Sequence, residues 1–155
     1  MCLLFLRYLK GDLSNPILPP KLSEKWVKRV TDEFFDQGDQ EKAMGLEASP
    51  MCDRATANIP NMQLGFIDFI ITPFYSVFFK FFPESPDSLK RNIQANYEHF
   101  AKLRATEAPD EKEKLEERTK KLRDKFNPNV DTKARRQTNL NLNVGTKSRR
   151  QTNLN

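Results

Sequence analysis

The residues of this sequence with the clearest chemical potential are Gln63 and Phe66, in the stretch QLGFIDFI. On a helix, residues three apart lie on one face, so the amide and the ring would point the same way. A glutamine amide offers a hydrogen-bond donor and an acceptor side by side, which suits the edge of a purine, and the ring can stack on a flat base. Any buried helix also needs apolar residues at such spacing, so these residues alone favour a plain core helix.

A second chemical residue is Asp12, in the short motif DLSNP. A carboxylate at a helix end can cap the backbone or ligate a metal ion, and caps are far commoner. The single histidine, His99, is expected on a helix with apolar neighbours and is interpreted as a surface or boundary residue. The two cysteines, Cys2 and Cys52, have neither disulfide-framework nor metal-site spacing, which indicates a reducing, cytoplasmic setting.

The elements that must position these residues are predicted to be helices, because no stretch alternates apolar and polar residues with the period of a strand. The fold class is therefore all-α. An amphipathic helix is expected from Leu22 to about Met44. Its apolar stripe recurs every four residues: Leu22, Trp26, Val30 and Phe34. Another helix is expected from Ser85 to Leu103. Its shared apolar face consists of Leu89, Ile93, Tyr97 and Phe100.

Between these two helices lies Gln63–Phe82, which holds seven of the twelve phenylalanines and is long enough to span a membrane. However, Asp68 and Lys80 fall inside it, and Pro73 interrupts it near the middle. A charge at the centre of a lone span costs ~3 kcal/mol or more. The segment is therefore predicted to be a core helix, from about residue 60 to residue 82, and no transmembrane span is expected.

Composition divides the chain into a predicted helical domain (1–104), a charged helix (105–126) and a disordered basic tail (127–155). In the charged helix, Leu115 and Leu122 are too few to fold alone, so a solvated extension is favoured over a partner-binding coil. Six of the 26 basic residues but only one of the 21 acidic residues lie after residue 125, so the net charge of +5 belongs to the tail. A neutral body does not suggest nucleic acid binding.

The tail carries a repeat, because NVDTKARRQTNLN (129–141) recurs as NVGTKSRRQTNLN (143–155). With one valine and one leucine in each copy, neither can bury enough surface to fold. Each copy places a threonine, Thr138 or Thr152, two residues after an arginine pair, an arrangement that basophilic kinases recognise. Phosphorylation of these threonines and electrostatic attachment to a polyanionic surface are the two uses considered for the tail.

Three motifs, in order, resemble the C-terminal third of the catalytic domain of class I 3',5'-cyclic nucleotide phosphodiesterases, over about Asp12 to Leu103. The motifs are DLSNP (12–16), EFFDQGDQE (33–41) with SPMCDR (49–54), and QLGFIDFI (63–70). The resemblance implies an all-α domain with a two-metal centre, holding Zn²⁺ and Mg²⁺ or Mn²⁺, and a deep pocket for cyclic AMP or cyclic GMP.

The resemblance also implies residue roles. Gln63 would select the purine, and Phe66 and Val30 would clamp the base from its two sides. Asn15 would reach toward the base, Phe34 and Met51 would line the pocket, and Asp12 would ligate the tightly bound metal. With this support the pocket-wall interpretation of Gln63 and Phe66 replaces that of plain core. Two stretches depart from the family pattern, LRYLKGD before Asp12 and PILPPK after DLSNP, and both flank the metal end.

Hydrolysis of a phosphodiester by two metals requires several ligands, an attacking hydroxide and an acid for the leaving oxygen. The family supplies these from histidines and aspartates upstream of DLSNP, whereas this chain has one histidine, downstream, and is assigned no catalytic residue.

Two interpretations follow from these missing ligands. The sequence is the purine-pocket piece of a longer metal-dependent phosphodiesterase, or it is a truncated, non-catalytic scaffold that attaches to a larger assembly through its basic tail. In either case apolar helix faces would be exposed, so association with a protein partner or with itself is expected.

Overall fold

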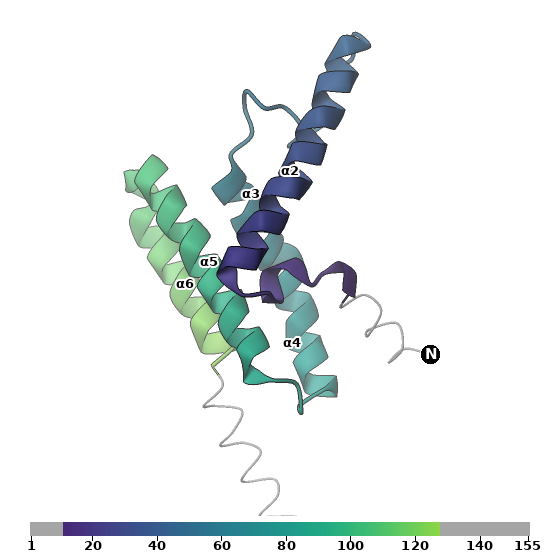
Figure 1. Cartoon of the computed structure of the whole chain (residues 1–155). Coiled ribbons are helices and arrows are strands. Elements are labelled where there is room, and N and C mark those ends of the chain that lie inside the picture. The colour runs from purple at the N-terminus through teal and green to yellow at the C-terminus, as the bar shows by residue number, and fades with distance from the viewer. Residues whose placement is uncertain (1–10, 128–155) are drawn as a thin grey trace, which may run out of the picture.

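The computed structural model describes residues 11–127, and within them every regular element is helical, which confirms the all-α prediction. A short 3-10 turn, η1 (Asn15–Ile17), leads into the long helix α2 (Pro20–Ala43). A loop then connects to α3 (Ile59–Phe66), a π-helical segment η2 (Ile67–Ile71) and α4 (Thr72–Phe81). After a second turn come α5 (Asp87–Glu107), a 3-10 turn η3 (Pro109–Glu111) and α6 (Lys112–Lys125). Figure 1 shows α5 and α6 side by side, with α2 extending away from the rest.

The segments α3, η2 and α4 form one continuous helix over Ile59–Phe81. It begins at Asn58, whose side chain accepts a hydrogen bond from the Asn61 amide (2.8 Å). A proline inside an α-helix lacks an amide hydrogen, and its ring crowds the carbonyl four residues earlier. The wide π turn comes just before Pro73, so the helix accommodates this residue without breaking.

This helix is long and apolar enough to cross a membrane by length and composition. One face of it, however, forms the centre of the core, including Leu64, Ile71 and Tyr75, each 0% exposed. Its charged residue Asp68 pairs with Arg118 of α6 and accepts a hydrogen bond from Tyr97 of α5. The other face of the helix is apolar but exposed, with Phe69, Ile70, Val77 and Phe81 at 44–78%, so the absence of a membrane span stays a prediction.

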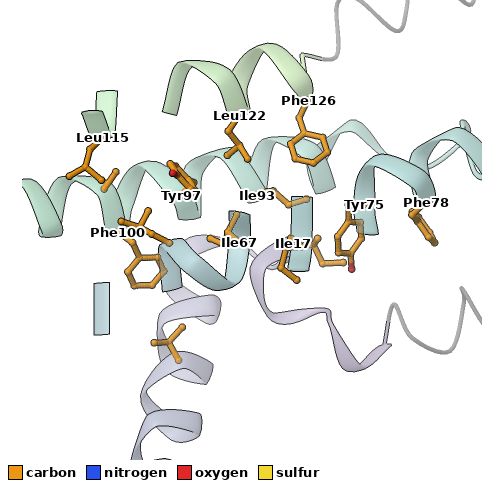
Figure 2. Packing of buried hydrophobic residues seen from close by; sticks show 14 of the residues in the cluster. Ile17, Ile67, Tyr75, Phe78, Ile93, Tyr97, Phe100, Leu115, Leu122 and Phe126 are labelled. Carbon is orange, nitrogen blue, oxygen red and sulfur yellow. The ribbon is translucent and has the colours of Figure 1, made fainter. Parts of the chain in front are cut away.

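The hydrophobic core lies where the continuous helix meets α5, and Figure 2 shows its side chains converging from α5, α6, η1 and this helix. Aromatic rings fill the end near α4, where the Phe78 and Phe82 ring centres are 4.7 Å apart. On α5, the expected face is largely confirmed, because Ile93, Tyr97 and Phe100 are buried and Leu89 is partly buried.

The apolar stripe predicted on α2 lies at the surface, in agreement with the expectation of exposed apolar helix faces. The stripe is 36–48% exposed, and the helix instead buries the neighbouring row of small and β-branched residues. That row consists of Ser23, Val27, Thr31 and Gly38. Both rows have nearly the same spacing, and the small residues allow a closer approach to the rest of the protein. Burial of Thr31 leaves no unpaired hydroxyl, because its Oγ1 lies 2.8 Å from the Val27 carbonyl.

The interpretation of residues 105–126 as a solvated extension also needs correction. Helix α6 packs along α5 and contributes Leu115, Leu122 and Phe126 to the core, each at most 4% exposed. Two leucines suffice here because α5 supplies the remaining apolar surface, and only the outer face of α6 is solvated. The proposed boundary at residue 104 stays a prediction, and the repeated tail lies outside the described residues.

Candidate functional site

The turn that carries the DLSNP motif is fixed by side chains from two later helices. The Tyr75 hydroxyl of α4 donates to the Leu13 carbonyl (3.2 Å). From α5, Asn92 donates to the Ile17 carbonyl (2.8 Å), and Asn96 donates to the carbonyls of Pro16 (2.8 Å) and Leu18 (3.0 Å). Burial raises the pKa of the Tyr75 hydroxyl, so this donor keeps its proton at neutral pH. None of these three tethering residues was singled out from the sequence.

Within this fixed turn, Asp12 and Asn15 differ in their surroundings. Asp12 is exposed, and its carboxylate is open to solvent. The Asn15 Oδ1 atom is buried and has no hydrogen-bond partner. A buried amide oxygen without a donor is costly unless something else supplies one. Asn15 is partly buried in this turn, and its role toward a base stays a prediction.

The described residues do not fit a metal site by themselves. No three His, Cys, Asp or Glu side chains gather within residues 11–127 in a group that could hold a metal ion. Asp12 would be a single ligand, whereas a two-metal hydrolytic site needs several. The chemistry that this part of the chain can perform is therefore recognition and positioning, and the remaining ligands would have to come from elsewhere.

Gln63 and Phe66 lie on α3, the first part of the continuous helix. Their neighbours Leu64 and Ile67 are at most 1% exposed and anchor the helix in the core. This anchoring leaves Gln63 and Phe66 partly buried at the margin of the core, and the Phe66 ring packs against it. Both side chains thus have a rigid support and an accessible side, which a base-binding pair requires.

The other predicted pocket residues come from α2 and from the loop that follows it. Val30 and Phe34 are about one-third exposed on α2, and Met51 is 56% exposed. Met51 has a φ of +70°, in the left-handed region that non-glycine residues rarely adopt. Such strain is kept only where the surrounding structure holds it, and here it directs the loop at the SPMCDR motif. The assignment of these three residues to a pocket stays a prediction.

The motifs EFFDQGDQE (33–41) and SPMCDR (49–54) form a clamp between α2 and this loop. Gly38 touches the loop so closely that an added Cβ would lie 2.0 Å from the Cys52 carbonyl oxygen, so only glycine fits. Arg54 bridges Asp36 (2.6 Å) and Asp39 (2.8 Å), one helical turn apart on α2. Its guanidinium also lies 5.1 Å from the centre of the Phe35 ring.

Glu41 and Lys42 complete the clamp. The Gln37 side-chain amide, together with the Ser49 amide and hydroxyl, holds the pKa of the Glu41 carboxyl below its usual range. Lys42 donates to Asp53 (2.6 Å) and lowers the pKa of that carboxyl. The sequence shows the motifs that contain these clamp residues, but the pairing of their charges was not predicted from it. Their charges pair between segments that only the fold brings together.

The matches with known proteins cover the part of the chain that contains these motifs. The family model for 3'5'-cyclic nucleotide phosphodiesterase matches residues 3–92. A Caenorhabditis elegans protein, probable 3',5'-cyclic-AMP phosphodiesterase pde-4, is 39% identical over 100 residues, which are 64% of this chain and 15% of that protein. The 3',5'-cyclic-AMP phosphodiesterase 4C of Rattus norvegicus is 39% identical over 90 residues, 58% of this chain and 17% of the relative.

Among solved structures, one titled "Structure of LmjPDEB1 in complex with IBMX" is 32% identical in sequence, with a TM-score of 0.40. The match covers 69% of this chain and 28% of the chain in that structure. The chain thus spans about a sixth of the length of the two relatives named above. Because the family model covers more than half of the sequence, the chain belongs to the 3'5'-cyclic nucleotide phosphodiesterase family.

Proposed function

We propose that this chain supplies the purine-binding part of a metal-dependent 3',5'-cyclic nucleotide phosphodiesterase, which hydrolyses cyclic AMP or cyclic GMP to the 5'-monophosphate. The observation that carries the proposal is the family match over residues 3–92, which includes the turn of Asp12 and Asn15 and the helix of Gln63 and Phe66. The named relatives are cyclic-AMP phosphodiesterases, so cyclic AMP is the first substrate to test.

In this proposal, residues of α2, α3 and the loop between them recognise the base of the nucleotide. Gln63 hydrogen-bonds the purine edge, Phe66 and Val30 hold its two faces, and Phe34 and Met51 close the pocket. Asn15, in the turn after Asp12, reaches toward the base. Asp12 contributes one ligand to a divalent metal such as Zn²⁺ or Mg²⁺, which would polarise the phosphate. The other ligands come from outside residues 11–127, and the enzyme works in the cytoplasm.

The first test is the intact mass of the protein from its native source that contains this sequence. The same protein is assayed for hydrolysis of cyclic AMP in the presence of Mg²⁺ or Zn²⁺. A mass well above 18.1 kDa together with turnover is expected. In that active protein Phe66→Ala should lower kcat/KM about tenfold or more, because stacking on a base contributes ~1–3 kcal/mol. The matched control is Phe69→Ala, on the same helix but 78% exposed, which should change kcat/KM less than twofold.

A second candidate function is a non-catalytic, phosphodiesterase-like scaffold that attaches to a larger assembly through its basic tail. The exposed apolar stripe of α2 favours this candidate, because a free surface of that kind usually has a partner. An intact mass of 18.1 kDa without turnover would support it over the enzyme. In the scaffold, phosphorylation at Thr138 and Thr152 should fall when the preceding arginine pairs are changed to alanine.

A further inference from the structure

The helix that carries Gln63 and Phe66 changes its geometry directly after these two residues. Helix α3 ends at Phe66, and the π-helical segment η2 (Ile67–Ile71) continues it without a break. A π turn holds about one residue more than an α turn, and each residue of an α-helix turns by about 100°. The place of this wide turn therefore sets the direction in which Gln63 and Phe66 point relative to α4.

Asp68, the second residue of η2, is held by donors from two other helices. Its Oδ2 atom accepts hydrogen bonds from Nε (3.1 Å) and Nη2 of Arg118 on α6 and from the Tyr97 hydroxyl of α5 (3.2 Å). Burial raises the pKa of the Tyr97 hydroxyl, so this group keeps its proton and stays a donor. The bonds from the guanidinium are charge-assisted and stronger than neutral ones, so they restrain the backbone of the π turn.

Both donors have rigid supports. Tyr97 is 0% exposed. On α6, Leu115 and Leu122 lie three residues before and four residues after Arg118, hence on the same face, and both are at most 4% exposed. Figure 2 shows these two leucines directed from α6 toward α5. Arg118 therefore reaches Asp68 from a helix that the core holds in place.

The contact joins two parts of the chain that differ in their relation to the family. Asp68 lies within the residues that the family model matches, as do Gln63 and Phe66, whereas Tyr97 and Arg118 lie beyond the end of the match at residue 92. Asp68 is two residues from Phe66, so a shift of the π turn is passed directly to the proposed base-binding pair. Helix α6 can thus influence base recognition without contacting the nucleotide.

From this arrangement we infer that Arg118 is a positioning residue for base recognition. Through Asp68 it holds the π turn in the register that directs Gln63 and Phe66 toward the purine, and Tyr97 supports the same carboxylate. Arg118 acts through the helix and touches neither the nucleotide nor a metal ion. The inference rests on the proposed function, because it requires that Gln63 and Phe66 bind the base.

The first test measures hydrolysis of cyclic AMP by the active protein that contains this sequence. Arg118→Met should raise KM about fivefold and change kcat less than twofold, because residues that act through a packed network alter binding by about this factor. A merely structural role gives a different result, since a smaller folded fraction lowers the apparent kcat and leaves KM unchanged. Arg118→Lys, which keeps the charge but loses the fork of donors, should give an intermediate KM.

Two matched variants separate positioning from general damage to α6. Arg123→Met removes another arginine of α6, which pairs with Glu98 of α5 (2.6 Å), and it should leave KM unchanged. In a protein that already carries Phe66→Ala, the further change Arg118→Met should lower kcat/KM about twofold or less, because the ring that Arg118 positions is absent.

The second test does not depend on turnover. Hydrogen exchange of the full chain is followed by mass spectrometry in the unaltered protein and in the two arginine variants. Arg118→Met should accelerate exchange of the η2 amides about fivefold or more relative to amides at the centre of α5, whereas Arg123→Met should not. A general loss of stability would accelerate exchange in both helices together.

Three outcomes would overturn the inference. They are an unchanged KM for Arg118→Met, an equal rise in KM for Arg123→Met, or exchange of the η2 amides that does not respond to Arg118→Met. Failure of the phosphodiesterase proposal would show instead as missing turnover by the unaltered protein. The exchange measurement would then still decide whether Arg118 holds the π turn.

Discussion

Asp68 is the point at which α6 is tied to the helix that carries the predicted base-binding residues, and breaking this tie gives a quantitative test of the fold. One carboxylate oxygen, Oδ2, accepts from Arg118 Nε of α6 (3.1 Å), from Arg118 Nη2, and from the Tyr97 hydroxyl of α5 (3.2 Å). Arg118 is 31% exposed and Asp68 26%. The pair is therefore neither a surface ion pair nor a fully buried one.

These exposures set the expected magnitude. Exposed ion pairs contribute ~0–1 kcal/mol, whereas hydrogen bonds to charged groups contribute ~1.5–3 kcal/mol when shielded from water. For a pair that is one-quarter to one-third exposed we expect a coupling free energy of about 1.5 kcal/mol. Arg118→Met keeps the apolar part of the side chain, and Asp68→Asn keeps an acceptor for Tyr97, so the two substitutions remove mainly the mutual attraction.

The assay is urea unfolding of the chain, the two single variants and the double variant, followed by circular dichroism. The matched control is Arg123 with Glu98, which also joins α6 to α5 (2.6 Å) but is 58% and 33% exposed. That pair should couple by about 0.5 kcal/mol or less. A coupling for Asp68 and Arg118 no larger than the control value would refute the reasoning, because α6 would then not be tied to the core helix through this carboxylate.

Three further predictions concern the clamp and the surface of α2. Gly38→Ala should destabilise the chain by ~1–3 kcal/mol in urea unfolding because its Cβ would collide with Cys52; Gly65→Ala, which has open space, should not, and equal effects would contradict the close contact. Glu41 has a lowered pKa, so the extra stability of the chain over Glu41→Gln should be present above about pH 4.5 and should vanish as the pH falls below it; a difference that is independent of pH would contradict the hydrogen-bonded carboxylate. Trp26→Lys should reduce self-association in sedimentation velocity, whereas Gln40→Lys should not; a wild-type chain that is already monomeric at high concentration would contradict an apolar docking surface.

Helix positions could be predicted from the sequence because they depend on local signals. The helix at 59–81 begins at an asparagine cap with a proline in its first turn, and its apolar residues recur at helical spacing. The π turn could not be predicted from the sequence. It accommodates Pro73 inside a helix that is kept continuous by its packing against the core. The partner of Asp68 lies 50 residues away on α6, and no local pattern signals such a pair.

The sequence pattern identifies the apolar stripe of α2 but not the row of residues that the helix buries. Two adjacent rows on this helix repeat at nearly the same spacing, one large and apolar, the other containing Ser23, Val27, Thr31 and Gly38. Hydrophobicity alone selects the first row. Close packing selects the second, because small residues let the helix approach α5 and the SPMCDR loop, as the Gly38 contact demonstrates. Sequence periodicity identifies that a helix is amphipathic more reliably than it identifies which row is buried.

On α2, the row that packs in the core and the row proposed to bind the nucleotide are different. Val30 and Phe34, which the family resemblance assigns to the nucleotide pocket, belong to it, and Leu22 and Trp26 continue it along the helix. A pocket wall must remain accessible, so residues that bind a base cannot also be buried in the core of the same helix pair. Apolar residues kept at a surface, beside a buried row of small ones, are what a binding role would produce. The assignment of Val30 and Phe34 to the nucleotide pocket stays a prediction, and the effect of Trp26→Lys on association tests whether the exposed stripe of α2 also binds a partner.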